Sequence, residues 1–442
     1  MASVTSGISL RYQVEATFGT APPTSGYQDV RFTAESLKPN MTYIRSNSIR
    51  ADGQTTNLLR TDAQGGGTIS VELAWEEYDT WMEAVLLSQA WGTSATAISA
   101  GAASQFTAST SAPGVPFLLT VTGETFVTKN YKVGMWVKVS GFTGGNVAAN
   151  GIYKVIEVAE TILHLQGNPA AIATSGESVV AIEQVEEIAN GLTERSFAVE
   201  REDEVAAAPP TLTDEFALYV ALGFQRMTLR IPAADIVTAE FEVIGKKPSL
   251  EATTIGTTAV TKTADPMVSS NVDLFLEGDT QLTNTSASLH LWNIAPFKLL
   301  EFTMQATPSL RVRNAVGNVG PALQHGRGDM LVTGTIRLYY HAGSDNRDDK
   351  VLLNKVLQGT VSSLAIRSLD TVNPLPNYFL FDLPRVKFID GQRVTPARSQ
   401  DVVLELTYEA YRSLNDYNDN TNVEGTTIRI IRGTSPTALP GD

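Results

Sequence analysis

Apolar and polar residues alternate in short stretches along much of the chain, which is the pattern of strands with one buried face. In residues 67–75, GTISVELAW, every second residue is apolar: Ile69, Val71, Leu73 and Trp75. Directly afterwards the apolar residues recur at helical spacing, at Tyr78, Trp81, Met82, Val85 and Leu86. Glu76 and Glu77 stand where the first helical turn would be, and the helix dipole favours acidic side chains there. The pattern predicts a strand followed at once by an amphipathic helix.

The same order of elements returns in the second half of the chain. Residues 334–340, GTIRLYY, alternate like a strand, and residues 348–358 have helical spacing with Gly359 as the C-cap. Three further strand candidates follow each helix. They are residues 194–201, 216–231 and 235–247 after the first, and residues 361–369, 377–389 and 400–411 after the second. The chain therefore carries one structural unit twice, and each unit is mainly β with one helix.

An insertion separates the first helix from the strands that follow it. It runs from Trp91 to about Thr193, whereas only a residue or two fills the equivalent gap in the second unit. An Ala-, Ser- and Gly-rich linker opens the insertion, and five short strand candidates follow. We therefore expect a small all-β domain in a surface loop. The predicted division is 1–100 and 190–248 for the first unit, 101–189 for the inserted domain, 249–295 for a bridging segment, 296–413 for the second unit and 414–442 for a C-terminal tail.

Composition and charge narrow the function. The 442 residues carry a formal net charge of −14 and include no cysteine, which excludes disulfides, thiolate metal sites and cysteine nucleophiles. Tight binding of nucleic acid is disfavoured, because phosphates are neutralised by clustered Lys and Arg. An acidic surface can still repel passing DNA, although the same charge also serves plain solubility. The first residues lack a basic start and an apolar stretch, so we expect neither a signal peptide nor a membrane anchor.

No residue pattern of an enzyme class is evident. The histidines are scattered without the spacing of metal ligands: His164, His290, His325 and His341. The sequence has no phosphate-binding loop, nucleophile elbow or dinucleotide fingerprint. We therefore expect no catalytic, metal-binding or cofactor-binding residues and no cofactor. A polysaccharide hydrolase stays an alternative, because the two carboxylates of a glycosidase have no fixed spacing in sequence.

Several stretches, in this order, resemble the tail tube proteins of long-tailed, siphovirus-type bacteriophages. The likeness lies in YQVEATFGTAP (12–22), RFTAESLKPN (31–40), IRSNSIRADGQ (44–54) and the first strand–helix pair, and then in residues 330–340, 383–388 and 403–411. It covers roughly residues 8–95 and 190–412. The resemblance implies a non-enzymatic virion protein of the mainly β (α+β) class, with two tandem β-sandwich units that each have one flanking helix. It also implies rings of six-fold or pseudo-six-fold geometry, stacked into a channel for DNA ejection.

The resemblance further implies the partners of the protein. They are other copies of itself, the tip, tape measure and terminator proteins of the tail, and DNA that passes without specific binding. Assembly would take place in the host cytoplasm. Because each chain holds two units, three chains would supply six, so we favour a homotrimer that forms a pseudo-hexamer over a hexamer of chains. Pairing of edge strands between neighbours would close such a ring and remove the exposed edges.

Two polar loops are candidates for contacts between rings. Their basic residues are Lys38, Arg45, Arg50 and Arg60 in the first unit, and Arg311, Arg313 and Arg327 in the second. Against so acidic a chain this clustering is uneven, and the loops could reach an acidic surface of the adjacent ring. The alternative is that they are solvated loops without a partner.

The acidic stretch between residues 183 and 204 is a candidate for the channel surface. Glu194, Glu200 and Glu202 could face the lumen from a strand and repel DNA, or they could belong to a solvated junction beside the insertion. We expect the inserted domain to point outward, because the lumen must stay clear. The main alternative for the whole chain is an adhesin or carbohydrate-binding β-sandwich. However, an adhesin would show aromatic residues on loops, and the tryptophans here fall mostly within strand and helix patterns.

Overall fold

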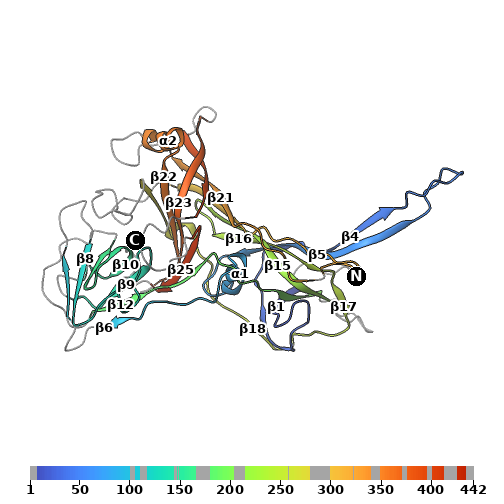
Figure 1. Cartoon of the computed structure of the whole chain (residues 1–442), viewed down its shortest axis with the longest axis horizontal. Helices are drawn as coiled ribbons and strands as arrows, with labels where there is room; N and C mark the ends of the chain where they lie inside the picture. Colours follow the sequence, from blue (N-terminus) through green and yellow to red (C-terminus); the bar gives the residue numbers. More distant parts are fainter. Residues whose placement is uncertain are drawn as a thin grey trace.

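Antiparallel strands dominate the fold, as the alternation of apolar residues predicts. The computed structural model describes residues 7–99, 105–109, 117–143, 147, 149–165, 180–203, 215–256, 258–278, 299–321, 323–339, 349–370, 376–395, 401–412 and 426–434. The molecule is elongated, with a two-stranded hairpin projecting at one end and a separate small sheet at the other (Figure 1). The mainly β fold class is therefore confirmed.

The first unit places its strands side by side in antiparallel pairs. In spatial order they are β4 (Lys38–Arg45), β5 (Leu58–Glu72), β16 (Thr238–Lys246), β15 (Glu215–Pro232), β14 (Phe197–Asp203) and β1 (Ile8–Val14). The short β3 (Ala34–Glu35) precedes β4 along the same edge of β5. β15 pairs with β14 through its first half and with β16 through its second half, so it connects the two layers of the unit.

The second unit repeats this order. Its strands are β20 (Leu299–Thr307), β21 (Leu331–Tyr339), β24 (Val403–Ala410), β23 (Asn377–Val394), β22 (Val361–Leu369) and β19 (Val272–Gly278). β23 pairs with β22 through its first half and with β24 through its second half, as β15 does in the first unit. The repeat seen in the sequence is thus also a repeat of strand pairing.

One helix accompanies each unit. α1 (Asp79–Val85) packs against β15, and α2 (Asp349–Gln358) packs against β23. Trp81 of α1 is fully buried, and its ring lies 5.2 Å from that of Phe224 and 5.1 Å from that of Phe241. Gly359 has a φ of +61°, the left-handed conformation expected of a helix C-cap. Apolar residues of both units form one continuous core.

The start of α1 differs from the prediction. The helix begins at Asp79 with Tyr78 as its N-cap, so Asp79 and not Glu76 or Glu77 lies in the first turn. Glu76 has a φ of +56°, which belongs to a turn and cannot continue a right-handed helix. The acidic side chain that meets the helix dipole is therefore that of Asp79.

Within the described ranges, the inserted residues form their own sheet of seven strands. In spatial order it contains β6 (Ile98–Ser99), β12 (Ala181–Gln184), β9 (Trp136–Ser140), β10 (Gly151–Val158), β11 (Ile162–Leu165), β8 (Phe117–Thr122) and β7 (Gln105–Ser109). It has a separate apolar core. Residues 204–214, 279–298 and 413–425 lie outside the described part, so the proposed domain boundaries there stay predictions.

Several short elements complete the main sheet. They are β2 (Ser25–Asp29), β13 (Glu186–Ala189), β17 (Ser249–Glu251), β18 (Thr258–Val260) and β25 (Arg429–Thr434), and the 3₁₀ turn Ser269–Asn271 precedes β19. β19 falls within the predicted bridging segment, yet it is the edge strand that pairs with β22. β25 falls within the predicted C-terminal tail, yet it pairs with β13 and β23. The segment IIRG alternates too briefly to stand out in the sequence, and its pairing partners are distant in the chain.

Candidate functional site: sheet edges and polar face

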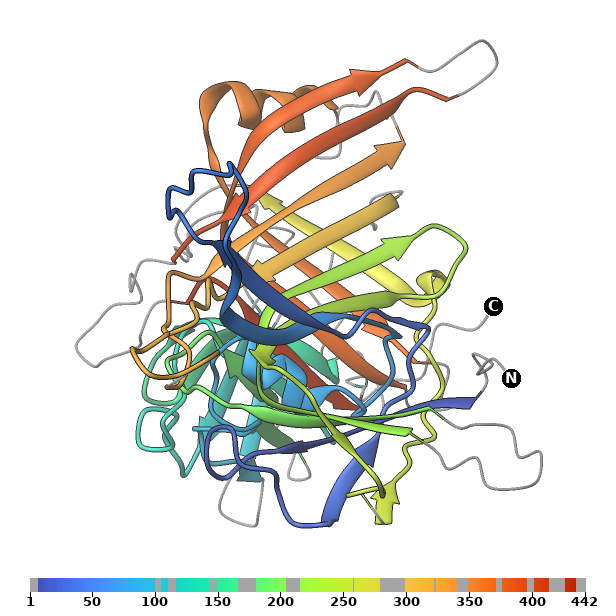
Figure 2. The same cartoon turned by 90° about the vertical axis from the view of Figure 1, so that its right-hand side faces the viewer.

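A direct strand pairing joins the two units. The second half of β15 pairs with β16 on one side and with β20 on the other. Thr228 lies opposite Gln305, and Leu229 lies opposite Met304. One sheet therefore continues from β4 and β5 through β16, β15, β20, β21 and β24 to β23 (Figure 2). We call the β15–β20 pairing the internal joint.

The two faces of this sheet differ in character. Along β16, buried residues alternate strictly with half-exposed residues, and Phe241 and Val243 point into the core. The opposite face is mainly polar, although Leu331 and Tyr339 are exposed at the two ends of β21. Its half-exposed or exposed polar side chains are those of Glu72, Arg226, Thr228, Arg230, Glu240, Glu242, Glu301, Thr303, Gln305, Thr333, Thr335, Arg337, Glu405, Thr407 and Glu409. We call it the polar face.

The arginines of the polar face are held by acids on neighbouring strands. Arg226 Nη2 lies 3.0 Å from Glu242 Oε2, and Arg230 Nε donates to Glu301 Oε1 at 2.9 Å. Arg337 Nη1 donates to the second oxygen of Glu301 at 3.1 Å. Partial burial alone would raise the pKa of Glu301, but the bonds from Arg337 and Arg230 outweigh it and hold the pKa below its ordinary value. These arginine side chains are thus paired with carboxylates, so few positive charges on the polar face are available to bind phosphates.

One end of the continuous sheet is the edge formed by β3 and the start of β4. Glu35 lies opposite Ile69 there, and Phe302 of β20 lies opposite Ile336. Ile69 and Ile336 hold the same place in the repeated GTI sequence, so Glu35 and Phe302 are counterparts in the two units. The same alignment gives the counterpart pairs Ala34–Glu301, Leu37–Met304, Lys38–Gln305 and Pro39–Ala306.

The other end is the second half of β23. Phe388 of β23 and Phe224 of β15 each precede a one-residue shift in pairing with the following strand. The counterpart pairs beyond that shift are Gly391–Met227, Gln392–Thr228, Arg393–Leu229 and Val394–Arg230. β15 uses this stretch to bind β20, whereas no described strand pairs with the outer edge of β23 there. The outer edge of β3 and β4 is equally unpaired within the described ranges.

The structure brings the two predicted basic loops to the same side of the sheet. Arg45, Arg50 and Arg60 lie on the hairpin of β4 and β5, which projects from the body (Figure 1). Arg311, Arg313 and Arg327 lie on the segment between β20 and β21. The two segments meet where Asn314 Nδ2 donates to Asp62 Oδ2 at 3.4 Å.

The six arginines are exposed, but three of them already have partners within the chain. Arg50 forms a salt bridge with Asp52 at 2.8 Å, Arg327 lies 3.1 Å from Glu194, and Arg311 donates to the Arg327 carbonyl at 2.9 Å. Exposed apolar side chains accompany the arginines: Tyr43, Ile44, Ile49, Leu58 and Leu59 on the hairpin, and Val316, Val319 and Leu323 on the other segment. Apolar exposure on this scale is typical of a surface that contacts another protein.

The three glutamates proposed for a lumen do not lie on the polar face. Glu194 pairs with Arg327, and Glu202 lies 2.8 Å from Arg11 Nη1. Glu200 is fully buried, because residues 254 and 255 cover it and donate to its carboxylate from the Thr254 hydroxyl at 2.8 Å and the Ile255 amide at 2.5 Å. Glu200 therefore cannot face a solvent-filled lumen, and that prediction is wrong. The signal that would have found the polar face is the alternation in TAEFEVI and VLELTYEA.

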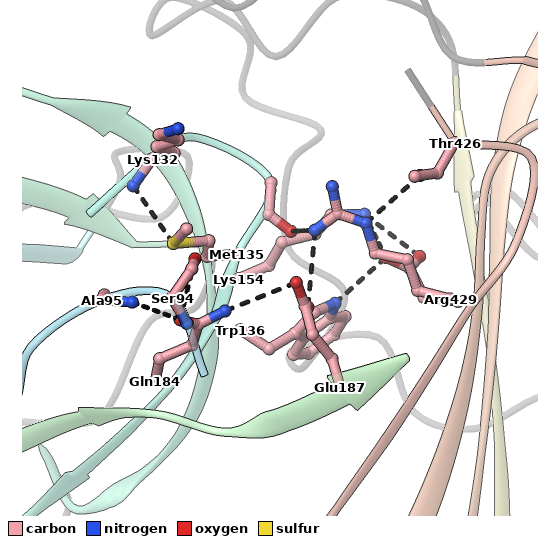
Figure 3. Close-up of polar contacts among 12 residues, drawn as sticks. Ser94, Ala95, Lys132, Met135, Trp136, Lys154, Gln184, Glu187, Thr426 and Arg429 are labelled. Carbon is pink, nitrogen blue, oxygen red and sulfur yellow. Dashed lines mark hydrogen bonds and ion pairs between the residues drawn. The ribbon is translucent and has the colours of Figure 1, made fainter. Parts of the chain in front are cut away.

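The inserted domain is fixed to the second unit by a buried polar cluster (Figure 3). Lys154 Nζ and Trp136 Nε1 both donate to the carboxylate of Asp382, at 3.1 and 3.0 Å, and all three side chains are almost fully buried. Nearby, Arg429 lies 3.5 Å from Glu187, whose pKa is raised by burial. Removing one member of a buried ion pair leaves the other charge buried without a partner, which is costly. The cluster therefore fixes the orientation of the inserted domain relative to the second unit.

The described residues contain no group of three or more His, Asp or Glu side chains placed to hold a metal ion. In the same part of the chain, no helix has the length and apolar character needed to cross a membrane. What the arrangement offers is surface for assembly: a long, mainly polar face, two edges that are unpaired among the described strands, and a projecting hairpin with a basic segment at its base.

The chain was found to match a known protein family. The model of a family described as phage tail tube protein matches residues 5–410, a stretch that includes both units and the inserted sheet. No protein of curated function matches the chain.

Proposed function

The chain belongs to the phage tail tube protein family, and we propose that three copies close into a ring by repeating the internal joint between chains. Its role is structural, and its place is the virion tail. The observation that carries the ring is the pair of unpaired edges, because they are the counterparts of the two strands that form the internal joint. Unpaired edges attract further strands, and a head-to-tail contact that closes removes them.

The internal joint predicts the register of the contact between chains. Thr228 lies opposite Gln305 within the chain, so Gln392 of one chain should lie opposite Lys38 of the next. The neighbouring pairs would be Gly391 with Pro39 and Arg393 with Leu37. Two units per chain then give six quasi-equivalent units in a trimer, which is a pseudo-hexamer.

The polar face supports the assignment of the channel surface. Core residues and the two helices pack on the opposite side of the sheet, so closing the sheet leaves the polar face to line the lumen. Glutamates such as Glu240 and Glu405 repel phosphates there, and the arginines are already paired with acids. DNA would thus pass during ejection without being retained.

The projecting loops are suited to stacking rings. The hairpin of β4 and β5 carries Arg45, Arg50 and Arg60 beside exposed apolar residues, and the segment with Arg311, Arg313 and Arg327 lies at its base. We assign these surfaces to contacts with the adjacent ring of a siphovirus-type tail. Tip, tape measure and terminator proteins would be the further partners, with assembly in the host cytoplasm. The inserted domain would lie outside the tube, since the lumen-lining sheet does not include it.

Cysteine pairs test the ring, because the chain has no cysteine of its own. Lys38→Cys with Gln392→Cys should crosslink chains in assembled tubes, and the product should run as a covalent trimer after denaturation. Thr228→Cys with Gln305→Cys is the matched control, because it places the same geometry inside one chain. Ser36→Cys with Gln392→Cys is out of register and should not crosslink. Electron microscopy should show three-fold rings, and crosslinking only of the out-of-register pair would refute the proposed joint.

A further inference from the structure

At each unpaired edge, an acidic side chain of the chain accepts a hydrogen bond from a backbone amide of the same edge. The Ser36 amide donates to Thr68 O of β5, so by strand alternation the Leu37 amide points to the outer edge. Glu35 Oε2 accepts the hydrogen bond from that amide at 2.8 Å. On the other edge, Asp390 Oδ1 accepts from the Gly391 amide at 2.8 Å. One amide on each edge, that of Leu37 and that of Gly391, is therefore already occupied by a side chain of the same edge.

On the core side of the sheet, the residues of the unpaired edges differ in charge from their counterparts at the internal joint. There the core-facing side is apolar, with Leu229, Phe302 and Met304 each at most 1% exposed. At the unpaired edges Arg393 takes the place of Leu229 and Glu35 takes the place of Phe302. Opposite charges thus replace two buried apolar residues of the core.

The internal joint contains one diagonal ion pair, which lies on the opposite face of the sheet. Arg230 lies opposite Thr303 in register, and Glu301 stands two residues before Thr303. Arg230 nevertheless bonds Glu301 across the joint at 2.9 Å. In the proposed contact Arg393 lies opposite Leu37, and Glu35 stands two residues before Leu37. Diagonal cross-strand neighbours are within reach of long side chains, so Arg393 and Glu35 can form an ion pair on the core side.

We infer that Glu35 exchanges partners when a ring closes: it releases the Leu37 amide of its own chain and pairs with Arg393 of a second copy. This inference rests on the proposed ring. The Leu37 amide then donates to the neighbour's strand, so no hydrogen bond is lost. Free chains are kept from pairing at random, and the charge pair selects the correct edge and register.

Arg201, the present ion-pair partner of Glu35, has a second carboxylate partner. Arg201 Nε lies 3.1 Å from Glu35 Oε1, but the contact lacks the geometry of a hydrogen bond. Arg201 also pairs with Asp203 at 3.0 Å, on its own strand. It therefore retains a carboxylate after Glu35 has moved.

Charge reversal and its repair test the exchange. Glu35→Lys or Arg393→Glu alone should lower the association constant at least about tenfold per joint, because like charges would meet. The double variant should restore assembly to within about threefold of the parent chain. Lys387→Glu is the matched control: it makes the same charge change on β23 outside the proposed register and should leave association unchanged. Sedimentation and tube yield give the readout, and thermal unfolding checks each fold.

The outcomes separate this inference from the ring itself. If the 38/392 cysteine pair crosslinks but the double reversal stays as poor as the single ones, the ring stands and the exchange is wrong. If tubes form without that crosslink, the joint fails and the exchange fails with it. If Glu35→Lys does not fold, two other variants still test the inference. They are Arg393→Glu, which lies on the exposed end of its strand, and the milder Glu35→Gln. Normal assembly of both of these variants would overturn the inference.

Discussion

The internal joint and the unpaired edges are formed by counterpart strands of the two units, but their charged residues lie on opposite faces of the sheet. At the internal joint the core side is apolar, and the ion pair of Arg230 with Glu301 lies on the polar face. At the edges the counterparts on the polar face are Val394 and Ala34, whereas Glu35 and Arg393 stand on the core side.

The difference follows from what each contact must do. A joint that forms once, as the chain folds, can bury apolar side chains permanently. A joint that forms later, between separate chains, needs edges that tolerate water until then. Charged residues on the core side meet that need, because exposed apolar strand edges promote aggregation.

The largest contrast should come from proline at counterpart positions. Leu229→Pro removes a ladder amide within the core of the sheet and should cost at least about 3 kcal/mol, a large fraction of the free energy of unfolding of a typical protein. Arg393→Pro removes an amide only from the outer edge, so the chain should fold and fail to form tubes. Circular dichroism and electron microscopy check the two results. Arg393→Ala keeps the amide, and its tube yield should exceed that of the proline variant; equal yields would show that strand pairing is not the contact.

Exchanging the core-side residues should have the next largest effect. Phe302→Glu buries a carboxylate without a partner and should cost about 3–5 kcal/mol in chemical denaturation. The reverse change, Glu35→Phe, frees the Leu37 amide and adds apolar surface to the edge. It should make chains associate irregularly at about tenfold lower concentration, as light scattering would record. A Glu35→Phe protein as soluble as the parent would contradict the protective role of Glu35.

Sequence patterns predicted much of this fold but not its contacts. The alternation in GTISVELAW and GTIRLYY identified the repeat, because alternation fixes which face of a strand is buried. It does not say which strand lies beside it, so the internal joint could not be derived. Glu200 was misplaced for the same reason, since its cover comes from residues 254 and 255, far away in the chain. Glu35 gave no signal, because its role depends on the counterpart Phe302.

The polar-face ion pair predicts a modest dependence on pH. The pKa of Glu301 is lower in the folded chain than in the unfolded chain, so its contribution to stability is present above the unfolded value and is lost as pH falls through the folded value. Arg230→Gln with Arg337→Gln should raise that pKa, seen by NMR titration, and flatten the loss of stability in acid. The side chain is partly solvated, so the cost near neutral pH should stay below about 1 kcal/mol. An unchanged pKa would show that the arginines do not stabilise the carboxylate.

The smallest effect tests whether the joint between chains can be made to resemble the internal joint more closely. Val394→Arg with Ala34→Glu would build the counterpart of the Arg230–Glu301 pair on the polar face of the contact. Such an exposed pair contributes up to about 1 kcal/mol, so association should tighten up to about fivefold per joint at low salt. High salt should reverse the gain. Each single variant serves as the control and should bring no gain, because one charge alone has no partner. Tightening in the double variant alone would show that the contact between chains reproduces the register of the internal joint.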